Sequence, residues 1–140
     1  MSIHSLLLSI RPKYAEQIFA GQKTVELRKV KPKVSSGDTV LVYVSSPTKA
    51  LLGAFEVDRV VEETPHNLWN TVSEAAGITK EEFANYYGGA EKAYGIFIKK
   101  SWHLDVPLAL SSLKDKWKNF HPPQSYRYVS SKEADILGVL

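Results

Sequence analysis

The most informative stretch of the sequence is Gly21-Gln22-Lys23-Thr24-Val25-Glu26-Leu27-Arg28-Lys29. Its alternating pattern and β-forming residues predict a strand over Thr24–Val30. Successive side chains on a strand point to opposite faces, so the apolar residues of this strand face the core. Glu26 and Arg28 then share the other face, where they can form an ion pair.

Lys23 lies at the start of this strand, beside the turn at Gly21. Its side chain is therefore free to reach across that turn. A lysine, a glutamate and an arginine placed together can bind an anionic backbone and orient a polar ligand. The alternative is an exposed salt bridge on an edge strand, which would contribute little to stability and have no role in binding. The residues alone leave both interpretations open.

Further strands and helices are predicted on both sides of this stretch. The predicted strands are Ile3–Ile10, Thr39–Val44, Ala50–Val61 with a bend at Gly53, and Ala93–Trp102. The predicted helices are a short one from Pro12 to Gly21, then Asn67–Ala76 and Lys80–Tyr87, followed from Pro107 by short helical turns. Strands that are not regularly alternated with helices are typical of an α+β fold, and five or more of them can curl into a small β-barrel.

The composition indicates one globular domain spanning residues 1–140, because 44% of the 140 residues are hydrophobic and 24% are charged. The two helices form an insertion over about residues 65–89, and about residues 107–140 form a C-terminal extension. No cysteine is present, which excludes disulfides, cysteine-ligated zinc and thiol nucleophiles and suits a cytoplasmic location. The apolar run Leu6–Leu8 is too short for a membrane span, and the four histidines lack metal-ligand spacing, so we expect no membrane, metal or cofactor.

Charge divides the chain into three segments. Residues 11–49 carry eight basic and three acidic side chains. Residues 56–91 carry two basic and eight acidic side chains, and residues 92–132 carry eight basic and two acidic ones. If the two basic segments meet in the fold, they form one positive face. Charge alone equally allows three separate solvated surfaces.

Aromatic residues gather near the C-terminus among basic ones. Trp117, Phe120, Tyr126 and Tyr128 are close in sequence to several cations, Arg127 among them. RNA single strands are held by base stacking on such rings beside cations. Most of these rings are expected in the core, with one or two at a site.

The sequence resembles the ASCH domain family of the PUA-like superfamily. The family pattern Gly-x-Lys-x-x-Glu-x-Arg is matched by Gly21, Lys23, Glu26 and Arg28, and further matches extend from about Leu6 to Arg127. They include the runs Tyr43-Val44-Ser45-Ser46-Pro47, Gly53-Ala54-Phe55, Tyr94-Gly95-Ile96 and Pro122-Pro123-Gln124-Ser125-Tyr126-Arg127. The resemblance implies a small PUA-like β-barrel with peripheral helices and a cleft for RNA or a nucleotide-sized ligand beside the motif.

The first hypothesis is therefore an RNA- or nucleotide-binding module with a regulatory role, whose oligomeric state the sequence does not indicate. The expected ligand-binding residues are Arg11, Lys13, Lys23, Glu26, Arg28, Ser46, Gln124, Tyr126 and Arg127. The alternative is a hydrolase, because some ASCH relatives deacylate a modified cytidine nucleoside and others are described as ribonucleases. Lys23 and Glu26 are the catalytic candidates, but Glu26 stands where the deacylase pattern has a threonine, so that assignment does not carry over.

The paired helices also resemble a helix-turn-helix. The second one offers Glu81, Glu82 and Asn85, whose acidic side chains phosphates would repel. DNA is accordingly the less favoured partner, and we expect the helices to pack on the barrel.

The alternation of charge also predicts how the segments are arranged in space. We predict that residues 11–33 and the segment Gln124-Ser125-Tyr126-Arg127 flank one concave site, with the acidic helices away from its positive wall. The alternative is that the C-terminal stretch only plugs the open end of the barrel.

Overall fold

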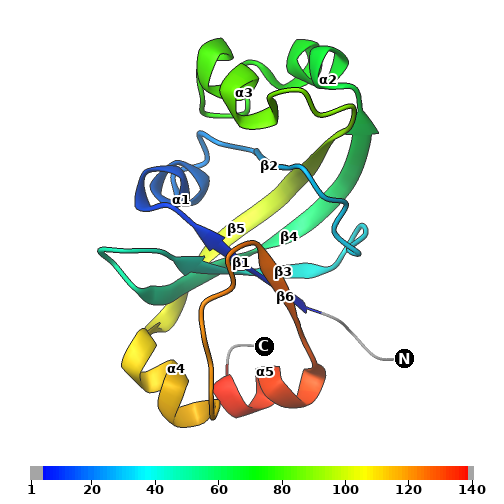
Figure 1. Ribbon diagram of the computed structural model, residues 1–140. Helices are drawn as coiled ribbons and strands as arrows, with labels where there is room; N and C mark the ends of the chain where they lie inside the picture. Colours follow the sequence, from blue (N-terminus) through cyan, green and yellow to red (C-terminus); the bar gives the residue numbers. More distant parts are fainter. Residues whose placement is uncertain (1–4, 139–140) are drawn as a thin grey trace.

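The structure, a computed structural model, describes residues 5–138 and consists of one strongly curved six-stranded sheet with helices around it (Figure 1). The strands are β1 (Ser5–Ile10), β2 (Val25–Arg28), β3 (Thr39–Val44), β4 (Ala50–Glu63), β5 (Ala93–Ala109) and β6 (Tyr126–Val129). The helices are α1 (Pro12–Phe19), α2 (Pro65–Val72), α3 (Lys80–Tyr87), α4 (Leu110–Lys116) and α5 (Ser131–Leu137). The α+β class is confirmed, and the sheet is a half-barrel.

The strand order is β2-β5-β4-β3-β1-β6, in which only β1 and β3 pair in parallel. The long strands β4 and β5 carry the curvature, and their register shifts between Leu51 and Gly53, where a bend is predicted. The strands β2 and β6 are the two edges of the sheet. The half-barrel therefore has an open side, across which its edges are linked by side chains.

Three apolar clusters hold the helices to the sheet. The first lies under α1 and includes Leu6, Leu8 and Ile18. The second holds α4 and α5 on the opposite face through residues such as Leu7 and Leu113. The third packs α2 and α3 on β2 and the adjoining end of β5. The helices α2 and α3 thus cover one end of the molecule and α4 and α5 the other (Figure 1).

The predicted elements differ from the structure mainly near the C-terminus. The strand predicted over Ile3–Ile10 is confirmed from Ser5 onward, and residues 3 and 4 lie outside the described residues. The strand β5 continues to Ala109, well past Trp102, because it pairs with β4 as far as the turn before Ala50. The predicted short turns after residue 107 are in fact α4, the edge strand β6 and α5. No helix in residues 5–138 combines the length and apolar character needed to cross a membrane.

Candidate functional site

The motif strand β2 places Glu26 and Arg28 together, as its alternation predicts. Val25 and Leu27 are buried in the cluster under α2 and α3. On the other face, a guanidinium nitrogen of Arg28 lies 3.0 Å from a carboxylate oxygen of Glu26. Both side chains are almost covered, at 12% and 11% exposure. This ion pair is therefore shielded from water, unlike the exposed edge-strand pair that was the alternative.

Lys23 is not free to reach across the Gly21 turn. The residue is only 3% exposed, and its amine donates a hydrogen bond to the carbonyl of Ala76, between α2 and α3. Its Nζ also lies 5.4 Å from the centre of the Tyr14 ring. Burial lowers the pKa of Lys23, partly offset by the negative charge of Glu26. Lys23 thus anchors the segment between α2 and α3 to the motif.

The motif reaches the other edge of the sheet through Arg28. Its second terminal nitrogen lies 3.4 Å from the carbonyl oxygen of Ser125, just before β6. Nearby, the backbone N–H of Lys33 donates to the hydroxyl of Tyr128 at 2.8 Å. We call these five residues the seam: Arg28, Lys33, Ser125, Tyr126 and Tyr128. The first basic segment therefore contacts the C-terminal segment at Ser125 and Tyr128, whereas a concave site between the two segments stays a prediction.

Arg127, in contrast, does not join this group. Neighbouring residues on β6 face opposite sides, and Tyr126 packs against the cluster under α1. The guanidinium of Arg127 instead lies 4.7 Å from the centre of the Trp117 ring and pairs with Glu133 at 2.7 Å. The prediction that Arg127 shares a site with Lys23 and Arg28 is wrong, because β-strand alternation directs it to the α4–α5 side.

The acidic helices are also nearer to the motif than expected. The hydroxyl of Tyr14, on α1, donates to a carboxylate oxygen of Glu82 on α3 at 3.3 Å. Tyr86 of α3 donates to the carbonyl of Leu27, and Lys29 lies 4.8 Å above its ring. Burial raises the pKa of Tyr86 and, with Glu82 adding to it, that of Tyr14. Neither tyrosine was predicted as a site residue, although Tyr14 occupies the helical face next to the motif.

The remaining predicted ligand-binding residues lie at the surface. Arg11 precedes the first turn of α1, and Lys13, also exposed, has its amine 5.7 Å from the centre of the Tyr14 ring. Ser46 is exposed in the turn between β3 and β4. Gln124 is exposed beside Ser125 at the seam. Within residues 5–138, no group of three His, Asp or Glu side chains is arranged to hold a metal ion.

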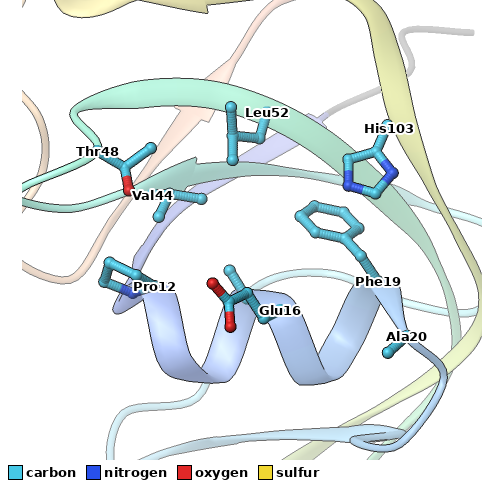
Figure 2. A pocket seen from close by; sticks show the side chains of 9 residues that line it. Pro12, Glu16, Phe19, Ala20, Val44, Thr48, Leu52 and His103 are labelled. Carbon is cyan, nitrogen blue, oxygen red and sulfur yellow. The ribbon is translucent and has the colours of Figure 1, made fainter.

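A pocket of about 330 Å³ lies on the other flank of α1, facing the turn between β3 and β4 (Figure 2). Its walls come from three places: the α1 residues Pro12, Ala15, Glu16, Phe19 and Ala20, then Val44, Thr48 and Leu52 around the turn, and His103 on β5. None of these residues was predicted to line a ligand-binding site. They are distant in sequence and match no motif, so only the folded arrangement shows them together.

Known proteins resemble this chain over nearly its whole length. A protein of Zymomonas mobilis described as an ASCH domain-containing ribonuclease is 28% identical over 132 residues, which are 94% of this chain and 88% of that protein. The crystal structure of ASCH from Zymomonas mobilis has a TM-score of 0.91 at 27% identity and covers 97% of this chain and 94% of that one.

A more distant likeness shows the fold alone. The N-terminal domain of McrB from Thermococcus gammatolerans, whose structure is bound to m5C DNA, has a TM-score of 0.56 at 14% identity. The alignment covers 96% of this chain and 94% of that domain. At the level of the family, the model of the ASCH domain matches residues 8–114, and the PUA-like, barrel-like sheet agrees with it. The chain therefore belongs to the ASCH domain family.

Proposed function

We propose that this ASCH domain binds RNA at the seam and the adjoining motif. The observation that carries the proposal is the state of Arg28. Its guanidinium is held between Glu26 and Ser125, yet its buried Nε has no hydrogen-bond partner among the described residues. A buried donor without a partner is costly, so a small shift of the Arg28 side chain toward a bound phosphate or base oxygen would give Nε an acceptor.

Basic and aromatic side chains around Arg28 suit a single strand. Lys29 and Lys33 are exposed next to the rings of Tyr86 and Tyr128, each of which is 37% exposed. Tyr126 and Tyr128 lie edge to face with their ring centres 5.4 Å apart. Cations that contact phosphates and rings on which bases stack are the usual means of holding single-stranded nucleic acid.

Several observations favour RNA over duplex DNA. The second helix of the inserted pair, α3, has Glu81 and Glu82 in its first turn, and Glu82 contacts Tyr14 beside the motif. Such a helix is a poor reader of the major groove, because its carboxylates repel phosphates. The Zymomonas relative is named as a ribonuclease, which supports RNA as the ligand of this chain too.

Fluorescence anisotropy with labelled RNA and DNA strands of about eight nucleotides tests this proposal. In Arg28→Lys the charge beside the buried Glu26 remains, but Nε and the forked geometry are lost, so we expect affinity to fall about tenfold. Lys118→Ala, which removes an exposed cation from the chain segment after α4, should bind as the wild type does. No RNA binding at low salt, or equal binding by Arg28→Lys and Lys118→Ala, would contradict the proposal.

A second candidate function is hydrolysis of RNA, favoured by the relative that matches 94% of this chain and carries the name of a ribonuclease. Lys23 is the candidate for proton transfer, because its amine lies in the motif and burial lowers its pKa. Labelled RNA and an acylated cytidine, incubated separately with the protein, distinguish the outcomes. RNA cleavage that Lys23→Met abolishes supports a ribonuclease, deacylation supports an amidohydrolase, and intact substrates support a binding module.

A further inference from the structure

The pocket on the far flank of α1 is built for a flat ligand. The Phe19 and His103 rings form one wall, with their centres 4.4 Å apart and their planes tilted by 35° (Figure 2). Phe19 can lie against β4 only because residue 53 is a glycine. A Cβ at Gly53 would be 2.6 Å from the Phe19 ring and 2.3 Å from the carbonyl oxygen of Trp102.

The remaining walls are largely apolar, with a single carboxylate at the edge. Pro12, Ala15, Val44 and Leu52 contribute hydrophobic surface, and the carboxylate of Glu16 points into the space between them and Phe19 (Figure 2). Apolar walls with a few placed polar groups characterise small-ligand sites, and about 330 Å³ is near the lower end of their size range. The volume therefore suits a nucleobase better than a large ligand.

We propose that this pocket binds a guanine base, packed against Phe19 and His103 with its Watson–Crick edge on Glu16. The inference rests on the proposed RNA binding and specifies which base the domain selects. A carboxylate only accepts hydrogen bonds. Guanine presents two adjacent donors on that edge, N1–H and the 2-amino group, so it can bind Glu16 with two parallel bonds.

The other bases fit this carboxylate less well. Adenine and cytosine each place a ring-nitrogen acceptor beside their amino donor, and that acceptor would face the second carboxylate oxygen. Uracil offers one N–H between two carbonyl oxygens. An acceptor of the base that faces a carboxylate oxygen is repelled, so the carboxylate discriminates against these three bases. The geometry of the acceptor thus selects guanine.

One strand can reach both the seam and the pocket along α1. Glu16 and Phe19 are on one flank of the helix, whereas Tyr14 is on the opposite flank, beside Lys23. Arg11 and Lys13 are exposed at the first turn between the two flanks. Their charges are placed to neutralise phosphates of a strand that passes from one flank to the other.

The test compares guanine with hypoxanthine, which lacks only the 2-amino group. Two labelled RNA strands that differ by one guanosine-to-inosine exchange are titrated by anisotropy, alongside guanosine and inosine monophosphates followed by the NMR signals of His103. We expect the guanine forms to bind about tenfold more tightly, as for a bidentate base contact.

Variants assign this preference to the pocket. Glu16→Gln replaces one acceptor oxygen with a donor and should abolish the preference, while the matched Glu91→Gln should keep it. His103→Ala should weaken binding of both forms and leave their ratio unchanged, since it removes stacking only. Glu16 and His103 are exposed, so the variants are expected to fold, which thermal melting verifies.

The outcomes separate this inference from the proposed function. RNA binding that depends on Arg28 but shows equal affinity for guanine and hypoxanthine overturns the guanine pocket and leaves the seam intact. If no RNA binds, the proposed function fails, and the nucleotides decide the pocket alone. A guanosine-specific, Glu16-dependent shift of His103 then supports the pocket, and the absence of that shift overturns it.

Discussion

The two flanks of α1 differ in what their polar groups contact. On the motif flank, Lys23 bonds to Ala76, Tyr14 bonds to Glu82 and Glu26 pairs with Arg28. On the pocket flank, the carboxylate of Glu16 faces an open space with apolar walls. The same short helix therefore has one flank that joins parts of the protein and one that borders an open pocket.

This difference changes how the family motif is understood. As whole residues, Lys23 and Glu26 are only 3% and 8% exposed, so they are too buried to bind a long anionic backbone directly. Lys23 instead bonds to the segment between α2 and α3, and Glu26 orients Arg28 toward β6. The motif thus supports the position of the Arg28 guanidinium, which links the two edges of the half-barrel.

The largest expected effect is on the pocket flank, at Gly53. In Gly53→Ala the new methyl group overlaps a backbone carbonyl and the Phe19 ring, and neither can move without shifting β5 or α1. We expect a loss of about 3 kcal/mol in the free energy of unfolding. Urea denaturation measures it, with Gly89→Ala as the control, since a Cβ at Gly89 meets nothing within 4 Å. Equal stabilities of the two variants would show that the wall formed by Phe19 is not tightly packed.

A smaller effect is expected on the motif flank, at Lys23. In Lys23→Met the side chain keeps its approximate volume, but the buried carbonyl of Ala76 loses its donor, at a cost of about 1–3 kcal/mol. Removing a buried charge offsets part of this cost near neutral pH. We therefore expect a net loss of about 1 kcal/mol at pH 7 by urea denaturation, whereas Lys118→Met should change little.

The pH dependence of this loss tests the buried state of Lys23. Burial lowers its pKa in the folded protein below the usual 10.5. At pH values between the lowered pKa of the folded state and 10.5, the unfolded chain binds more protons than the folded protein does. The free energy of unfolding of the wild type therefore rises with pH in this range. Lys23→Met lacks this gain. The difference in the free energy of unfolding between the wild type and the variant should therefore grow toward pH 10.5. Tyrosines with raised pKa values act in the opposite direction at higher pH but are common to both proteins. A difference that is constant with pH would contradict the lowered pKa.

Much of the fold was predictable because local patterns and packing agree. The alternation in Val25–Arg28 defines both faces of β2, and the helix predicted over Lys80–Tyr87 is confirmed at both ends. That helix begins at a capping box of Thr79 and Glu82. A second capping box, Ser130 with Glu133, marks the start of α5. The residues of this capping box are visible in the sequence, although the prediction for this region was only short helical turns.

The arrangement of the site was predictable only in part. The charge segments predict that the two basic segments lie close together, and Arg28 does contact Ser125, but charge carries no information about which face of β6 each side chain takes. The position of the Arg127 side chain depends on that detail. Because successive residues of a strand face opposite sides of the sheet, Arg127 points away from the side that Tyr126 faces. The pocket was not predictable, because the contact of Phe19 with His103 depends on the close approach of α1 to β4 and β5 at Gly53.

The smallest effect, and the one that connects the two flanks, is expected at Lys13. This lysine is exposed between the flanks, and its amine lies 5.7 Å from the centre of the Tyr14 ring, so Lys13→Ala should hardly change stability. If one RNA strand passes from the seam to the pocket, the substitution removes one phosphate contact. The slope of log affinity against log salt should then become shallower by about 0.7, the value for one contact to a single strand. Lys118→Ala should leave the slope as it is. An unchanged slope in Lys13→Ala, together with intact guanine selection, would mean that strand and base reach their sites by a path that does not cross the first turn of α1.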